Sequence, residues 1–116
     1  MPRAATTTDV FNAIAEPRRR HLIEVLARRG ALAVGALVVA VGLPQPAVSK
    51  HLGVLRKVGV VSVDRNGRER VYRLNAQELK SVYDWAKSFE RFWSHQLDRI
   101  KQRAEEKARA RADASR

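Results

Sequence analysis

The sequence predicts a small, mainly helical α+β domain in which one helix is followed at once by a β-hairpin. Between Gln45 and Val58 apolar residues recur at helical spacing, whereas after Gly59 apolar and polar residues alternate with a period of two. An Asn66-Gly67 pair separates the two alternating runs, and this pair is the strongest short signal for a hairpin. The 116 residues are enough for one domain with a modest core.

The predicted helix 45–58 has two unlike faces. Its apolar stripe consists of Val48, Leu52, Leu55 and Val58. The opposite face carries small, hydrogen-bonding or cationic residues, namely Gln45, Ser49, Lys50, Gly53, Arg56 and Lys57. A face of this kind can enter the major groove of DNA, where Gln, Ser, Lys and Arg meet base edges and phosphates. Gly59 follows where a left-handed helix cap is expected.

The predicted hairpin is basic at its tip. Apolar and polar residues alternate over 61–64 and again over 71–74. We expect a type I′ turn at Asn66-Gly67, in which both central residues need positive φ. The charged residues around the turn are Asp64, Arg65, Arg68, Glu69 and Arg70. A short arm with an excess of arginine suits phosphates or the minor groove.

Three further helices are expected before this pair of elements. The first runs from Asp9 to about 15, with Thr8 or Asp9 as its cap. The second covers 18–29 and starts after Glu16-Pro17, because proline suits the first position of a helix. Residues 32–41 are expected to form a short extended segment and then a short helix that Gly42 closes.

The last predicted helix starts after Asn75, which forms a capping-box pattern with Glu78. No proline or glycine follows, so we expect a single helix over 76–103 that is roughly 40 Å long. Five of the seven aromatic residues fall within 83–93. They occupy too wide an arc for one neighbour, which favours a second copy of this helix over a larger local core. The expected dimer surface consists of Phe11, Val82, Trp85, Ala86, Phe89, Trp93, Leu97 and Ile100.

One run within the predicted DNA-binding region resembles a known family. The run Gln45-Pro46-Ala47-Val48-Ser49-Lys50-His51-Leu52, followed by Leu55-Arg56 and Gly59-Val60-Val61, is similar to the recognition helix and wing of ArsR/SmtB-type repressors. The resemblance covers about residues 9–100. It implies a winged helix-turn-helix fold, with four helices, a two-stranded wing and a long fifth helix for dimerisation. It also implies a homodimer that blocks transcription, with one helix in the major groove.

The residues and the resemblance together predict a set of DNA contacts. They are Gln45, Ser49, Lys50, His51 and Arg56 on the helix, and Arg65, Asn66, Arg68 and Arg70 on the hairpin. Two positions depart from the family pattern. Pro44 stands where a Ser or Thr cap is common, so that cap hydrogen bond is missing. Gly53 stands where the family often has a basic residue, and a glycine there costs the helix about 1 kcal/mol.

Composition favours double-stranded DNA as the partner. The net charge is +11, from 23 cations and 12 anions, which points to a polyanion. A membrane surface is the competing polyanion, but no segment is a basic amphipathic helix with a free apolar face. Cysteine is absent, which excludes disulfides and thiolate metal sites. The start of the chain lacks the apolar core of a signal peptide, so a cytoplasmic location is expected.

The expected organisation is a flexible arm over 1–8, a DNA-binding and dimerisation domain over 9–102, and a basic, disordered tail over 103–116. No nucleophile with a base, paired carboxylates or phosphate loop appears, so neither an enzyme nor a cofactor is expected. One alternative is a metal-responsive repressor that uses Asp84, His95 and Asp98 across the dimer, a loose match to relatives with such sites. The other is a basic module that docks on an acidic protein. The sequence identifies neither an operator nor an effector.

Overall fold

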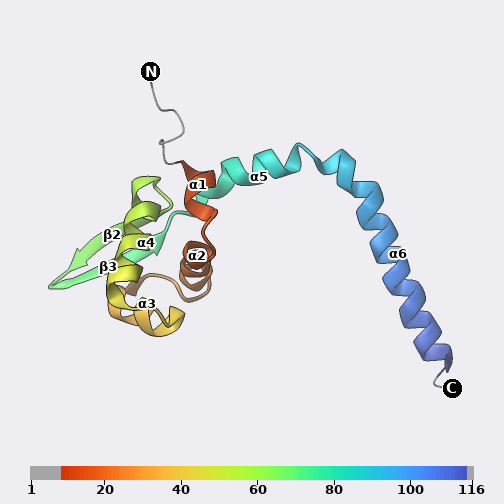
Figure 1. Cartoon of the computed structure of the whole chain (residues 1–116), viewed down its shortest axis with the longest axis horizontal. Helices are drawn as coiled ribbons and strands as arrows, with labels where there is room; N and C mark the ends of the chain where they lie inside the picture. Colours follow the sequence, from red (N-terminus) through yellow and green to blue (C-terminus); the bar gives the residue numbers. More distant parts are fainter. Residues whose placement is uncertain (1–8, 115–116) are drawn as a thin grey trace. The chain divides into compact units, whose positions relative to one another are not determined.

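The computed structural model describes residues 9–114, so the expected arm over 1–8 lies outside the described residues. Contacts within the chain divide it into two units, with the boundary between Val82 and Tyr83 (Figure 1). The first unit contains α1 (Val10–Ile14), α2 (Pro17–Arg29), β1 (Leu32–Ala33), α3 (Val34–Val41), α4 (Gln45–Lys57), β2 (Val61–Asn66), β3 (Glu69–Leu74) and the 3₁₀ helix η2 (Ala76–Leu79). The boundary lies within α5 (Lys80–Lys87), and α6 (Glu90–Ala114) belongs to the second unit.

The helices begin and end at the residues that local chemistry favours. Asp9 caps α1, because its Oδ1 accepts a hydrogen bond from the Asn12 amide at 2.8 Å. Pro17 occupies the first turn of α2. Gly42, with φ 68°, closes α3 in the left-handed conformation that glycine adopts without strain. The predicted short extended segment before α3 is present as β1.

The core of the first unit lies where α2, α3, α4 and the sheet meet. Its largest fully buried side chains are Leu22, Leu37, Leu52, Leu55, Val48, Val60 and Val61. Helix α4 contributes three of them, which confirms the predicted apolar stripe. Its N-cap, Pro44, makes no side-chain hydrogen bond, as expected, and Gly59 follows the helix with φ 83°.

The sheet has three antiparallel strands in the order β1-β3-β2. The two-residue strand β1 pairs with β3, so it adds an edge to the predicted hairpin. The hairpin β2–β3 extends beyond the helices of the first unit (Figure 1). Val61 lies opposite Leu74 and Asn66 lies opposite Glu69.

The predicted type I′ turn is wrong by one residue. Asn66 still belongs to β2, and the two loop residues are Gly67 and Arg68. Among the described residues only glycines have positive φ, and Gly67 has φ 66°. This is the pattern of a type II′ turn, which needs glycine at its first central position.

The expected single last helix is divided, and its capping box is absent. Asn75 makes no cap hydrogen bond, and a 3₁₀ turn precedes α5. Within the second unit, α5 ends at Lys87 and α6 begins at Glu90. The Ser88 hydroxyl donates to the Trp85 carbonyl at 2.6 Å, and this side-chain bond competes with the helical backbone pattern.

Helix α6 continues to Ala114, where we expected a disordered tail from 103. The physical reason is composition, since Ala, Glu, Lys and Arg dominate this stretch and all favour helices. None of the described helices is long and apolar enough to span a membrane.

Candidate nucleic-acid interface

Helix α4 presents the predicted polar face to solvent. Gln45, Ser49 and Arg56 fall within about 40° of one another around the helix axis, because each residue turns the helix by about 100°. Lys50 is also exposed, further round the same side. None of these four side chains has a hydrogen-bond or ion-pair partner among the described residues. The face therefore carries donors and positive charge that no protein group satisfies.

His51 does not share this face, although we expected it to contact DNA. It is half-buried, and its Nδ1 lies 3.5 Å from Nη1 of Arg19 on α2. Burial, followed by the neighbouring charge of Arg19, lowers the pKa of His51 below its ordinary value. A helical wheel could have placed His51 correctly, because it projects between the buried Leu55 and the half-buried Val58.

The hairpin, hereafter the wing, carries unpaired positive charge at its tip. Arg65, Asn66, Arg68 and Arg70 are all exposed. Asp64 pairs with Arg73 instead, with its Oδ2 at 3.1 Å from Arg73 Nε. In the part of the chain that the structure describes, Arg65, Arg68 and Arg70 form no ion pair. Arg65 lies directly opposite Arg70 in the strand register, an arrangement of like charges that is unfavourable without an anion.

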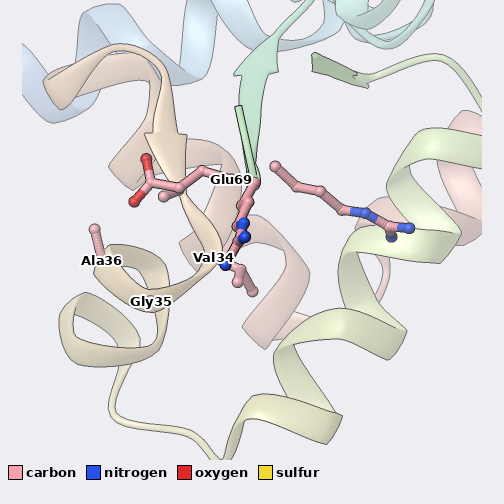
Figure 2. A pocket seen from close by; sticks show the side chains of 7 residues that line it. Val34, Gly35, Ala36 and Glu69 are labelled. Carbon is pink, nitrogen blue, oxygen red and sulfur yellow. The ribbon is translucent and has the colours of Figure 1, made fainter. Parts of the chain in front are cut away.

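An open pocket of about 520 Å³ lies between the wing and the start of α3 (Figure 2). Figure 2 shows Val34, Gly35 and Ala36 on the α3 side and Glu69 on the wing side. Its full lining is Ala33, Val34, Gly35, Ala36, Arg68, Glu69 and Arg70. Two of the wing arginines thus lie beside the α3 N-terminus, where no side chain caps the helix. The hollow thus brings Arg68, Arg70 and the carboxylate of Glu69 to the start of α3.

One carboxylate near α4 is held in its charged form. Glu16, the N-cap of α2, accepts hydrogen bonds from the side chain and the backbone of Arg18, with Oε1 at 3.0 Å from Arg18 Nε. These bonds lower the pKa of Glu16 to about 2. Glu16 is therefore negative at every physiological pH and balances part of the arginine charge at the start of α2.

The residues expected at a dimer surface are largely exposed. In α5, α6 and the two residues between them, seven large apolar side chains from Tyr83 to Ile100 have exposed fractions of 39% to 64%. The set includes Trp85, Phe89, Trp93, Leu97 and Ile100 from the predicted surface. Val82 and Ala86 are half-buried, and Phe11 on α1 is exposed. Trp85 and Phe89 contact each other edge to face, with ring centroids 5.3 Å apart.

The alternative metal ligands are not gathered within one chain. Asp84 lies on α5, whereas His95 and Asp98 lie on α6. Over residues 9–114, no group of three or more His, Cys, Asp and Glu side chains is close enough to hold a metal ion. A site made from two copies of the chain is a different arrangement, and it needs a separate test.

Sequence reasoning missed two polar side chains that hold α4 and the wing in place. Arg19 joins α1 to α4 through His51, and Asn75 joins the start of β2 to the end of β3. Asn75 was noticed in the sequence but was interpreted as a helix cap, because an Asn followed by Glu three residues later fits a capping box. No sequence signal distinguishes Arg19 from the arginine on either side of it.

Comparisons with known proteins agree with this architecture. A family model described as bacterial regulatory protein, arsR family, matches residues 16–63. The chain is 31% identical over 81 residues to the transcriptional repressor SdpR of Bacillus subtilis, an alignment that covers 70% of this chain and 89% of SdpR. The crystal structure of a possible transcriptional regulator for arsenical resistance matches with a TM-score of 0.60 and 36% identity, over 76% of this chain and 88% of that one.

A third relative is known as a dimer in solution. It is the homodimeric winged helix-turn-helix DNA-binding domain of Mb0332 from Mycobacterium bovis, a possible ArsR-family transcriptional regulator. The match has a TM-score of 0.58 and 27% identity, over 70% of this chain and 74% of that one. The fold, the exposed donors of α4 and these relatives lead to one conclusion. The chain belongs to the ArsR family and is a winged helix-turn-helix DNA-binding transcriptional regulator.

Proposed function

We propose that this regulator is a homodimeric repressor whose two copies of α4 read a palindromic operator, and that it needs no metal ion. Gln45, Ser49, Lys50 and Arg56 would contact bases and phosphates in the major groove. Arg65, Asn66, Arg68 and Arg70 would contact the backbone or the minor groove from the wing. Because DNA is the partner, we expect the protein in the cytoplasm and expect no catalytic activity.

The observation that carries the proposal is the unsatisfied positive charge on two adjacent elements. Polar groups that have no protein partner, on a helix whose other face is buried, are available to a ligand. The Arg65–Arg70 pair strengthens the case, because like charges directly opposite on a hairpin repel each other until an anion lies between or beside them. Phosphates of a DNA duplex supply such anions at regular spacing.

The proposed dimer rests on the apolar surface of α5 and α6. Neither helix has a buried residue. The segment 83–93 nevertheless carries two tryptophans and two phenylalanines. Clusters of large exposed apolar side chains normally mark an interface. We retain Phe11, Val82 and Ala86 as predicted members of that interface. A symmetric pair would repeat α4 on two half-sites, as a palindromic operator requires.

The test is fluorescence anisotropy with labelled DNA from just upstream of the protein's own coding region, compared with unrelated DNA of equal length. The Lys50→Ala/Arg56→Ala variant should lose preference for the upstream DNA and keep its thermal stability. If both cations contact phosphates, the slope of log affinity against log salt should fall by about 2.

The matched control is Arg28→Ala/Arg29→Ala, which removes the same charge from the exposed end of α2. Its DNA preference should be unchanged. Equal preference in the two double variants would contradict the assignment of α4 as the reading helix. Titrations with EDTA and then with zinc test the metal alternative. If zinc releases the wild-type protein from DNA but does not release the His95→Ala variant, a metal site across the dimer is favoured.

A further inference from the structure

The Arg19 side chain connects three helices of the first unit. Its Nε donates to the carbonyl of Ala13, and its Nη2 donates to the carbonyl of Asn12 at 3.3 Å. Both carbonyls belong to α1, which has only five residues and is too short to be stable without tertiary contacts. The remaining nitrogen, Nη1, lies 3.5 Å from Nδ1 of His51 on α4.

The contact with His51 requires a neutral imidazole. Arginine is always protonated, so Nη1 can only donate a hydrogen bond. Nδ1 of His51 must therefore be the acceptor, and the ring proton must reside on Nε2. A second proton on the ring would turn Nδ1 into a donor and would place two positive charges 3.5 Å apart.

The position of His51 makes this contact relevant to DNA reading. His51 follows Ser49 and Lys50 directly, and it lies about 160° from Ser49 and about 100° from Lys50 around α4, at the edge of the buried stripe. A change in the contact behind α4 would rotate or shift the helix, and the donors on its front would move with it.

On the basis of the function proposed above, we infer that Arg19 is a positioning residue for DNA recognition. It ties α4 to the end of α1 through neutral His51, so protonation of His51 weakens specific binding. The device would make operator binding sensitive to mild acid without any bound effector.

The electrostatics around His51 set the sign of the pH dependence. Arg19, Arg18 and Lys50 oppose its protonation, as does burial, whereas Glu16 favours it. The net effect lowers the pKa of His51, so between that value and about 6.5 the unfolded chain binds more protons than the folded one. The contact is therefore intact above about pH 6.5 and is lost as the pH falls through the pKa of the folded state.

The test compares the wild type with His51→Gln from about pH 8 to pH 5.5, on upstream and unrelated DNA. Glutamine offers Arg19 a carbonyl acceptor that does not titrate. We expect the ratio of the two wild-type affinities to fall severalfold over this range, with the fall confined to pH values below about 6.5. In His51→Gln the ratio should stay constant, because the tie no longer depends on a proton. His21 and His95 are present in both proteins, so the comparison cancels any effect they have.

A second pair of variants separates positioning from simple capping of α1. Arg19→Lys keeps the charge but loses the fork that reaches two helices, so it should lower the affinity ratio about tenfold at pH 8. Arg20→Lys is the matched control. Arg20 also donates to the end of α1, at 2.7 Å to Ile14 and 3.1 Å to Ala15, but has no bond to α4 among the described residues. It should leave the ratio unchanged.

Two results would overturn the inference. One is a pH profile that is the same in wild type and His51→Gln. The other is an affinity for the upstream DNA that rises in acid for the wild type but not for His51→Gln. That result would make His51 a direct phosphate contact. If the wild type shows no preference for the upstream DNA or for any other duplex at pH 8, the proposed function fails instead.

Discussion

At the scale of single residues, Asn75 holds the base of the wing together. Its Nδ2 donates to the carbonyl of Gly59 at 3.0 Å and to the hydroxyl of Ser62 at 2.5 Å. Its Oδ1 accepts from Nη1 of Arg73 at 3.1 Å. One side chain thus links the turn after α4, the first wing strand and the last one. None of these three partners belongs to the expected DNA contacts.

We predict that Asn75→Ala lowers the free energy of unfolding by about 1–3 kcal/mol, because partly buried groups lose their partners. Equilibrium urea denaturation measures this change. Gln77→Ala is the control, since Gln77 is exposed in the adjoining 3₁₀ helix and should cost within about 0.5 kcal/mol. Similar values for the two variants would show that the Asn75 network does not stabilise the fold.

At the scale of elements, α4 contains a glycine that lowers the stability of the helix. Gly53 is an exposed residue within the helix, and a Cβ placed there would meet no atom within 4 Å. Glycine loses more backbone freedom on folding than other residues, so this position costs stability without a packing reason. The exposed side of α4 thus combines small side chains with a locally less stable backbone.

We predict that Gly53→Ala raises the free energy of unfolding by about 0.5–1 kcal/mol. Gly42→Ala makes the same chemical change at φ 68°, where a Cβ is strained, and should instead destabilise by about 1 kcal/mol or more. Thermal unfolding of both variants gives the comparison. A loss of stability in Gly53→Ala would contradict the prediction, because it would mean that a Cβ at position 53 clashes with a neighbouring atom in solution.

The elements also show what could be predicted from sequence. The order of helices and the wing followed from local periodicity and from glycines at the ends of helices. The turn was wrong by one residue, because Asn66 pairs with Glu69 across the hairpin and pairing is a property of two strands together. The break after Lys87 was missed, because no proline or glycine marks it and no periodic pattern reveals the Ser88 hydroxyl bond that lies there.

The candidate site divides in the same way. Gln45, Ser49, Lys50 and Arg56 were placed on an exposed face by helical spacing alone, and the structure confirms that placement. His51 was grouped with these residues because the family-like run was read as a block instead of residue by residue around the helix. It lies off that face, half-buried beside Arg19, and its contact with DNA stays a prediction. Arg19 could not be found from sequence, because its contact with His51 spans 32 positions of the chain.

At the scale of the whole molecule, the net charge of +11 and the unburied aromatic residues set the proposed mode of action. In that proposal the charge attracts any DNA, and the geometry of two α4 helices supplies the specificity. A dimer fixes that geometry, because its two-fold symmetry places both helices on one face of the duplex about one helical turn apart. Leu97, exposed on α6 and part of the proposed interface, is the position to perturb.

The most direct test is selection of binding sites from a random library of DNA duplexes, followed by sequencing of the enriched pool. The wild type should enrich an inverted repeat with half-site centres about 10 base pairs, or a multiple of this, apart. Leu97→Glu would place repelling charges in the proposed interface, so it should enrich a single half-site or nothing. An asymmetric wild-type motif, or no enrichment over the starting library, would contradict recognition by a symmetric pair of α4 helices.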